Sequence, residues 1–376
     1  MTGGPPVLGI DYTAGPGHAP GVGRYVRELV RALVRLDDAA TRPLVLVEVG
    51  RGPRPMEGAP LGLVGATAVR RRRLRVPRRV VRALPGMSLA VAGGCRLFHR
   101  VAPDAPPVGA TPFTLAVAEL PRTGTAAGHA FADAASRAKA TIVFSTDARD
   151  RVLATTDAAA ARVHVAPVGT DHWERDLEAP PPRRPTRDVL VLGAIRSARR
   201  PLQALRGFEA LRANGARARL LLVGRPGDSA APFREALARS PVRGDVRWIE
   251  TPDEARMPGC VAGATALLHL ADDEATPVTP LEAMRHGLPV VASPLPAFRE
   301  ALGDDGLWVD ADDAAAVGAA LREALDAGEH APRRKALAVR ARPYTWRACA
   351  EAHVQAWDPI LRVPDHAVPG RAGGQR

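Results

Sequence analysis

The segment from Asp272 to Met284 contains the residues of this sequence that are best suited to chemistry. Two carboxylates, Glu274 and Glu282, stand eight positions apart, and Thr279-x-x-Glu282 with Pro280 inside it has the pattern of a capping box at a helix start. A helix that starts at the carboxyl edge of a parallel sheet offers free N–H groups and a positive dipole end to phosphates. A nearby carboxylate can accept hydrogen bonds from two ribose hydroxyls. Glu282 can therefore serve as a helix cap, as a nucleotide ligand, or as both.

The elements around this segment alternate between strand and helix patterns, which is typical of a Rossmann-type nucleotide-binding domain. The predicted strands are Val189–Gly193, Arg219–Val223, Val246–Ile249, Ala266–Leu270, Pro289–Ala292 and Leu307–Val309. The predicted helices are Pro201–Ala213, Pro232–Ala238, Asp253–Ala262, Pro280–Arg285 and Asp313–Asp326. We place this domain at residues 188–343.

The first half of the chain has the same alternation and predicts a first Rossmann-like domain at residues 1–178. A strand pattern at Val7–Asp11 is followed by a Gly/Pro-rich loop and by an amphipathic helix with apolar residues at three- and four-residue steps. Further strands are predicted at Leu44–Val49, Arg96–His99, Phe113–Val117, Ala140–Phe144 and Arg162–Val165. A proline-rich linker is predicted at 179–187, a C-terminal helix that crosses back to the first domain at 344–362, and a disordered tail at 363–376.

Composition excludes several classes of protein. The chain has 376 residues, 46% hydrophobic and 24% charged, which is enough for two globular domains. Its three cysteines, Cys95, Cys260 and Cys349, form no CxxC pair, which argues against a disulfide scaffold or zinc ribbon. No signal-peptide pattern and no apolar run of about 20 residues is present, so we expect a cytoplasmic protein that does not span the membrane. The net charge of +12 favours anionic partners.

Several segments of the chain resemble the retaining GT-B glycosyltransferases of the group 1 family (family 4). The E-x7-E spacing of Glu274 and Glu282 leads into a sequence, AMxxGxPVVAS, that is similar to the family's. Other similar segments are Gly21–Tyr25, Leu97–His99, Val165–Asp171, Leu192–Arg200, Leu220–Gly224 and Asp304–Asp310. The resemblance spans about residues 7–360. It implies an α/β fold with two Rossmann-like domains whose parallel sheets face each other across a central cleft.

The resemblance also implies a reaction and a set of site residues. The chain would transfer a sugar from a nucleotide-diphosphate-sugar, with retention and without a metal or another cofactor, to an acceptor bound mainly by the first domain. Glu274 would lie beside the transferred sugar, and Arg199, where the family usually has lysine, would bind the diphosphate. Further expected donor ligands are Glu282, Arg196, Arg200, Thr276, Val278 and Thr279. Gly21 and Gly23 would let the first loop approach the donor phosphate or the acceptor closely.

The chain departs from the family pattern at three places. Ala194 replaces the family's arginine after the strand-end glycine, which leaves Arg196 or Arg200 as substitute cations. Pro277 stands where a glycine could have offered an N–H group to the ligand. Ala118 removes a histidine that ordinarily contacts the donor sugar. These losses leave open a second hypothesis, a non-catalytic glycosyltransferase-like binding protein or partner subunit.

For the missing histidine, the nearest replacements in the sequence are His99 and His129. Either of them can also be an ordinary structural or exposed residue. A third reading of the two carboxylates, as the acid and nucleophile of a glycosidase, has little else in the sequence to support it.

A basic run from Arg70 to Arg82 contains eight arginines in thirteen positions. It is typical of a solvated surface, but it also suits peripheral docking on the anionic inner face of a membrane or binding of a phosphorylated acceptor. Nucleic acid is not expected as a partner, because aromatic residues are only 4% of the chain. The acceptor itself is left open among a lipid-linked molecule, a saccharide and a small molecule. The donor base, the donor sugar and the oligomeric state are open as well.

Overall fold

The computed structural model of the chain describes residues 7–16, 21–38, 42–50, 69–84, 87–102, 105–176, 187–250 and 256–362. The chain divides into two compact units, which we describe separately. The first unit consists of Met1–Phe144, Arg149–Ala166 and Arg347–Arg376, and the second consists of Ser145–Ala148 and Pro167–Trp346. Apart from residue 187, the predicted linker at 179–187 lies outside the described residues, as does the predicted tail at 363–376.

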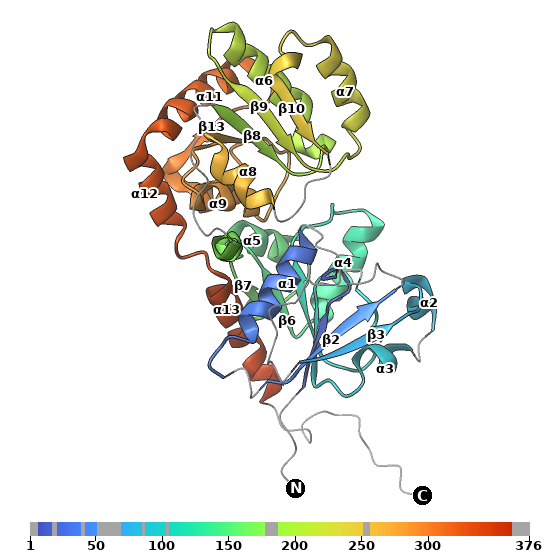
Figure 1. The fold of residues 1–376 in the computed structure, drawn as a ribbon. Coiled ribbons are helices and arrows are strands. Elements are labelled where there is room, and N and C mark those ends of the chain that lie inside the picture. Colours follow the sequence, from blue (N-terminus) through green and yellow to red (C-terminus); the bar gives the residue numbers. More distant parts are fainter. Residues whose placement is uncertain are drawn as a thin grey trace, which may run out of the picture. The chain divides into compact units, whose positions relative to one another are not determined.

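The first unit is built on a seven-stranded parallel sheet with the strand order β3-β2-β1-β4-β5-β6-β7 (Figure 1). The strands are β1 (Leu8–Asp11), β2 (Leu44–Val49), β3 (Val69–Leu74), β4 (Leu97–Arg100), β5 (Phe113–Val117), β6 (Ala140–Val143) and β7 (Val163–Val165). Every residue of β1, β2, β5 and β6 is buried, as expected for strands that are covered on both faces. The helices of this unit include α1 (Val22–Leu33), α2 (Arg78–Ala83), α3 (Met87–Ala92), α4 (Ala126–Arg137) and, from Arg149 onward, α5 (Thr146–Thr155).

The first half of the basic run forms the edge strand β3, which was not predicted. Four consecutive arginines pair in parallel with β2, with Arg71 opposite Leu46 and Arg73 opposite Glu48. Nε of Arg71 donates to Oε1 of Glu48 over 3.1 Å, and Nε of Arg73 lies 3.8 Å from Oε2 of the same carboxylate.

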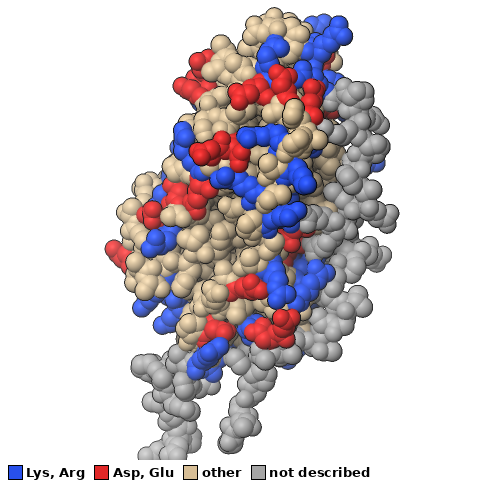
Figure 2. Space-filling view, turned by 90° about the vertical axis from the view of Figure 1, so that its left-hand side faces the viewer, with Lys and Arg blue, Asp and Glu red and all other residues tan. Residues whose placement is uncertain are grey.

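On the face drawn in Figure 2, basic side chains are interspersed with acidic ones. The positive net charge is therefore not gathered into a single block on that face.

The second unit has a six-stranded parallel sheet with the strand order β10-β9-β8-β11-β12-β13. Its strands are β8 (Asp188–Leu192), β9 (Arg219–Val223), β10 (Val246–Ile249), β11 (Ala266–His269), β12 (Val290–Ala292) and β13 (Gly306–Trp308). Its helices are α6 (Pro201–Ala213), α7 (Ala230–Arg239), α8 (Met257–Gly263), α9 (Val278–Arg285), α10 (Pro296–Leu302), α11 (Ala314–Glu329) and α12 (Ala331–Ala341).

Two apolar layers cover the two faces of this second sheet. Consecutive strand residues alternate between the layers, so that Leu268 packs with Phe208 of α6 while Leu267 packs with Met284 of α9 and Phe298 of α10. Helices α6, α7 and α11 cover one face, and α8, α9, α10 and α12 cover the other. The strand order reverses between β8 and β11. In an open α/β sheet, ligands bind at the carboxyl ends of the strands at such a point.

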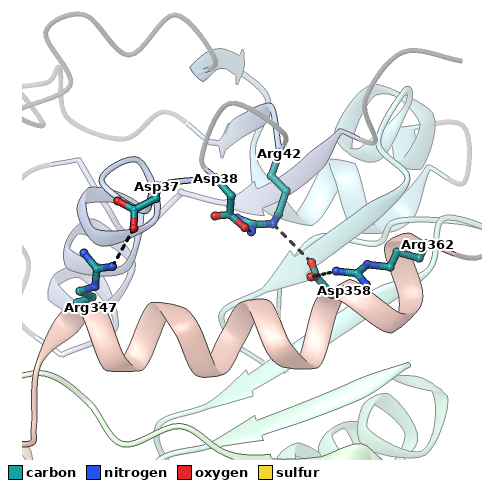
Figure 3. A network of polar contacts seen from close by, with 6 residues as sticks. All are labelled: Asp37, Asp38, Arg42, Arg347, Asp358 and Arg362. Carbon is teal, nitrogen blue, oxygen red and sulfur yellow. Dashed lines mark hydrogen bonds and ion pairs between the residues drawn. The ribbon is translucent and has the colours of Figure 1, made fainter. Parts of the chain in front are cut away.

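The last helix, α13 (Trp346–Leu361), belongs from Arg347 onward to the first unit. Figure 3 shows the ion pairs that tie it to the segment after α1. A guanidinium nitrogen of Arg347 lies 3.3 Å from a carboxylate oxygen of Asp37, and Nε of the buried Arg42 lies 3.5 Å from Oδ1 of Asp358. Arg42 also pairs with Asp38. Helix α13 is thus attached to residues that directly follow α1.

Candidate functional site

The turn that follows β8 contacts the end of β9, and the two backbones approach each other at Gly193 and Gly224. Gly193 has a φ of +128°, a conformation that side-chain-bearing residues rarely adopt. A Cβ atom on Gly224 would stand 1.8 Å from the carbonyl oxygen of Gly193, so only glycine permits this approach of the two backbones. The amide of Gly193 in turn donates to the carbonyl of Val223 over 2.9 Å. These contacts fix the start of the loop that leads to Arg199.

The short 3₁₀ turn Ser197–Arg199 ends at Arg199 and is held in place by hydrogen bonds with residues outside the turn. Asp228 accepts hydrogen bonds from the amide of Ser197 over 2.7 Å and from its hydroxyl over 3.0 Å. These two bonds lower the pKa of Asp228. The carbonyl of Ala198 accepts a 3.0 Å bond from the amide of Asp272, which lies in the turn after β11. The turns after β8 and β11 are therefore bonded to each other at the point where the strand order reverses.

Arg200, the residue after this turn, is the one non-glycine residue with positive φ in the part of the chain that the structure describes. Its φ of 50° and ψ of 47° place it in the left-handed region, directly before Pro201 at the start of α6. Its guanidinium lies 3.2 Å from Asp272 and also pairs with Asp312. Arg200, one of the two predicted substitutes for the cation missing at Ala194, therefore has its charge already compensated by two carboxylates.

Arg199, Glu274 and His269 form a cluster at the carboxyl ends of β8 and β11. Nη1 of Arg199 lies 2.9 Å from Oε2 of Glu274, and Nη2 donates to Oε1 over 3.2 Å, which makes a two-pronged ion pair. Nε2 of His269 lies 2.9 Å from Oε2 of the same carboxylate. The arginine side chain is 33% exposed, whereas the glutamate is 13% and the histidine 2% exposed. A small pocket against this cluster is lined by Gly193, Ala194, Arg199 and His269 among others.

The cluster combines an ionised carboxylate with a neutral imidazole. Burial alone would raise the pKa of Glu274, but the charge of Arg199 and the contact with His269 outweigh it, so the net pKa is lowered. Burial lowers the pKa of His269, and Glu274 opposes that effect only in part. The negative charge of Glu274 is therefore matched by Arg199, the one group of the three that has substantial exposure to solvent.

The predicted capping box is wrong, because helix α9 starts at Val278 and not after Thr279. Pro277 is its N-cap residue, and no side chain caps the helix. The first turn of a helix has no intrahelical acceptor for its N–H groups, so Pro280 fits at the third position as well as at the first. The amide of Val278 donates to the carbonyl of Thr276 over 2.8 Å, and that of Leu281 donates to Pro277 over 3.2 Å. Among the described residues, this first turn therefore leaves only the amide of Thr279 without a backbone acceptor.

Glu282 lies on α9 and is 1% exposed. Its Oε1 is 3.2 Å from Nε2 of His172. The indole nitrogen of Trp346 donates to Nδ1 of the same imidazole over 3.2 Å, so Nδ1 carries no proton and Nε2 does. The contact of Nε2 with the carboxylate is close but lacks the geometry of a hydrogen bond. His172 is a residue that sequence reasoning missed. The carboxylate of Glu282 must be uncovered before it can reach a ribose, and its burial also argues against the glycosidase-like pairing with Glu274.

The other predicted donor ligands differ in their accessibility. Arg196 is exposed, Thr276 is buried, and Val278 and Thr279 are half-buried. All four belong to the second unit.

Gly21 and Gly23 belong to the first unit, at the start of α1. Gly21 is the N-cap residue and has a φ of +65°, and its carbonyl accepts from the amide of Tyr25 over 2.9 Å. A Cβ atom there would meet nothing within 4 Å. The positive φ favours glycine at this position, and the space beside it is compatible with the predicted approach of a phosphate or acceptor, which stays a prediction. Gly23 is buried within the helix.

The two histidines that could have replaced the one missing at Ala118 are placed differently. His99 is fully buried in the first unit, with Nε2 2.9 Å from Oη of Tyr25 and Nδ1 2.9 Å from Oγ1 of Thr114. Both of its nitrogens are therefore engaged inside the fold. His129 is exposed on α4.

No helix among the described residues combines the length and the apolar character that crossing a membrane requires.

Comparison with known proteins gives a family match within the second unit and a fold for the chain. The model of the family described as "Glycosyl transferases group 1" matches residues 186–327. No protein with curated function matches the chain in sequence at a significant level. Among solved structures, sucrose-phosphate synthase from Thermosynechococcus elongatus is 17% identical with a TM-score of 0.71, covering 95% of this chain and 99% of its own.

Two other solved structures have the same arrangement over nearly their full length. The glycosyltransferase WaaG, involved in lipopolysaccharide biosynthesis, is 16% identical with a TM-score of 0.67 and covers 95% of this chain and 100% of its own. A structure described as trehalose-6-phosphate from E. coli bound with UDP-2-fluoro glucose is 10% identical with a TM-score of 0.69, covering 95% and 99%. At these identities the likeness concerns the fold, two Rossmann-like α/β units of the GT-B type.

Proposed function

We propose that this chain, whose residues 186–327 match the group 1 glycosyltransferase model and whose two units have the GT-B fold, transfers a sugar from a nucleotide-diphosphate-sugar to an acceptor with retention at the anomeric carbon. The donor would bind in the second unit, at the carboxyl ends of β8 and β11. The observation that carries this proposal is the position of Arg199, partly exposed beside a buried, ionised Glu274 at the reversal of the strand order. A diphosphate needs a cation of this kind at such a place.

The proposed chemistry follows from the charge that develops as the anomeric bond breaks. The departing diphosphate gains negative charge, and the Arg199 guanidinium stabilises it with two parallel N–H groups. The acceptor hydroxyl attacks on the same face of the sugar, and an oxygen of the departing phosphate takes its proton. This route uses no metal and no cofactor other than the donor. Glu274 supplies a fixed negative charge beside the transferred sugar.

The carboxylate of Glu274 already occupies Arg199 when no donor is bound. A diphosphate carries more negative charge than one carboxylate and presents several oxygens, so it can compete for the guanidinium. We propose that donor binding turns Arg199 from Glu274 to the diphosphate. The 33% exposure of the arginine side chain supports this, because the exposed member of the pair is the one with space to turn.

The first unit would bind the acceptor, which we leave as a lipid-linked molecule, a saccharide or a small molecule. One solved structure with this fold is described as bound with UDP-2-fluoro glucose, which supports a nucleotide-sugar as the donor class. The basic run from Arg70 to Arg82 would be the part of the first unit that contacts an anionic membrane surface or a phosphorylated acceptor.

The first experiment is calorimetric titration of the purified chain with UDP, GDP, ADP and dTDP, followed by a donor screen that measures released nucleotide by mass spectrometry. We expect one nucleotide to bind and its sugar conjugates to be turned over. Binding without turnover would favour the alternative that the losses at Ala194, Ala118 and Pro277 leave a non-catalytic binding protein or partner subunit. No binding to any of the four nucleotides would overturn the proposal.

A further inference from the structure

One nitrogen of His269 faces two partners that it cannot satisfy together. Nε2 lies 2.9 Å from Oε2 of Glu274 and 2.6 Å from Nη1 of Arg199. A guanidinium has only hydrogen-bond donors, and a carboxylate has only acceptors. A nitrogen of a neutral imidazole carries either a proton or a lone pair, so Nε2 serves one of these neighbours and not the other.

The geometry favours Glu274 as the true partner. Nη1 of Arg199 is also 3.5 Å from Nδ1 of His269. A hydrogen-bond partner of Nε2 in the ring plane lies outside the ring, directly away from Nδ1. Its distance from Nδ1 would therefore be much longer than the 3.5 Å that separates Nη1 from Nδ1. Nη1 is therefore displaced from that axis toward the face of the imidazole, where it makes a poor hydrogen bond to Nε2. The contact with Glu274 has no such conflict, and it assigns the proton to Nε2.

We infer that His269 is a positioning residue that holds Glu274 through Nε2–H when Arg199 turns to the diphosphate. The inference rests on the proposed function, because the diphosphate is what draws Arg199 away. Without Arg199, Glu274 would be a buried carboxylate with no cation beside it, and burial would favour its neutral form. The Nε2–H group then keeps the carboxylate ionised and pointed toward the sugar.

The packing of the three side chains supports this division of roles. His269 closes strand β11 and its ring meets the ring of Phe298 edge-on, with centroids 5.2 Å apart, so the imidazole is confined. Glu274 is nearly as enclosed, whereas a third of the Arg199 side chain is exposed. The charged groups that act on His269 are Glu274 and Glu282, which raise its pKa, and Arg199, which lowers it. When Arg199 moves away, the charged groups that still act on His269 are Glu274 and Glu282, both of which raise its pKa.

The first test needs no nucleotide. Arg199→Ala imitates the departure of the guanidinium, and ¹⁵N NMR of the full chain reads the tautomer and pKa of His269, with the signal assigned by its absence from His269→Gln. We expect the Nε2–H tautomer in both the wild type and the variant, and a higher His269 pKa in the variant. An Nδ1–H tautomer in the wild type, or a pKa that does not move, would overturn the inference whether or not the chain binds a nucleotide.

The second test measures turnover once a donor is known. His269→Leu removes the donor group, and His269→Gln places an amide N–H near the position of Nε2. We expect His269→Leu to lower kcat roughly tenfold, the effect of one charge-assisted hydrogen bond, with little change in donor KM. The acid limb of kcat should also move to higher pH. His269→Gln should restore most of kcat.

Exposed His330 on the same unit supplies the control variant, His330→Gln, which should match the wild type. Equal losses in His269→Leu and His269→Gln, or losses that follow the melting temperature without a shift of the pH profile, would mean that His269 only fills space. A wild-type chain that fails to bind any nucleotide would remove the proposed function, while the NMR result on Arg199→Ala would still decide the role of His269.

Discussion

Oη of Tyr25 lies 2.7 Å from Nε2 of His353, so the first and last helices of the chain share a buried hydrogen bond. Nδ1 of His353 is 2.7 Å from the carbonyl of Cys349, which can only accept, so Nδ1 carries the proton and Nε2 accepts from Tyr25. The tyrosine oxygen must then accept from Nε2–H of His99. The same logic gives Thr114 O–H as donor to His99 Nδ1. Every proton in this buried chain of bonds is thereby assigned.

This chain predicts a loss of stability in acid. Burial lowers the pKa of His353 from 6.5 to about 4 and also lowers that of His99. Below pH 6.5 these two imidazoles are protonated in the unfolded chain but stay neutral in the folded chain. The free energy of unfolding therefore falls as the pH drops toward 4. His353 alone accounts for up to about 3 kcal/mol of this loss. Urea denaturation between pH 7.5 and 4 measures it, and a flat profile over that interval would contradict the assignment.

Tyr25→Phe provides the matched variant for this network. It removes one hydroxyl and leaves Nε2–H of His99 and Nε2 of His353 without their partner in a fully buried place. We expect a loss of about 1–3 kcal/mol in the free energy of unfolding at pH 7.5, from the desolvated groups that stay unpaired. Tyr12→Phe, in the same unit, serves for comparison. Equal stability of Tyr25→Phe and wild type would mean that the network contributes nothing net.

Much of the fold follows from local patterns, and the exceptions have a physical cause. Buried strands such as β2 and β5 are uninterrupted apolar runs, which predict a sheet covered on both faces. Strand β3 escaped prediction because four of its six residues are arginines, which an edge strand tolerates by pairing with β2 and reaching solvent or Glu48. The start of α9 was misplaced because Pro280 fits the third helical position as well as the first, so this proline alone does not fix where the helix begins.

The candidate site was predictable only in part. Arg199 and Glu274 came from the resemblance to the family, and the structure brings them into contact across 75 residues of sequence. His269 and His172 acquire their roles from contacts that no spacing reveals. The one available signal for His269 is a polar residue that closes the apolar strand Ala266–His269, at the sheet edge where ligands bind.

Two substitutions of Arg199 distinguish the effect of its charge from the effect of its paired N–H groups in the proposed reaction. We expect Arg199→Ala to lower kcat by about 10²–10³-fold, the usual effect of removing one group that stabilises transition-state charge. Arg199→Lys should recover part of this loss, because it keeps the charge but not the paired N–H groups. Steady-state kinetics with the donor found in the screen measures both. Full activity of Arg199→Ala would remove this residue from the mechanism.

Substitution of Glu282 tests whether this buried carboxylate becomes exposed and binds the ribose when the nucleotide binds. Glu282→Gln keeps the shape of the side chain and removes only its charge, at a place where an oxygen lies 3.2 Å from Nε2 of His172, so it should fold normally. If the carboxylate binds the ribose, the variant should bind the nucleoside diphosphate about tenfold more weakly, since charged acceptors form stronger bonds than neutral ones. The difference should vanish with the 2′,3′-dideoxy nucleotide in calorimetry. An equal loss with both nucleotides would mean that Glu282 acts only through the fold.

The ion pairs on α13 are expected to differ in strength according to burial (Figure 3). The Arg347 and Asp37 side chains are 60% and 92% exposed, so a double-mutant cycle between them should give a coupling of about 0–1 kcal/mol that salt reduces. Arg42 is 7% exposed and lies between Asp38 and Asp358. Arg42→Ala should therefore destabilise the chain more than Arg347→Ala in urea titrations. The reverse order would contradict this reading of the network.

Gly224 connects the stability of the second unit to its candidate site. In Gly224→Ala the new Cβ would stand 1.8 Å from the carbonyl oxygen of Gly193 and 3.0 Å from the amide nitrogen of Ala194, which are backbone atoms that cannot rotate away. The ends of β8 and β9 must then separate, at a cost of at least about 1–3 kcal/mol. Because the displaced turn carries Arg199, nucleotide affinity should fall as well. Gly244→Ala, where a Cβ would meet nothing within 4 Å, is the control, and both variants melting and binding alike would show that the close approach of the two glycines is not needed.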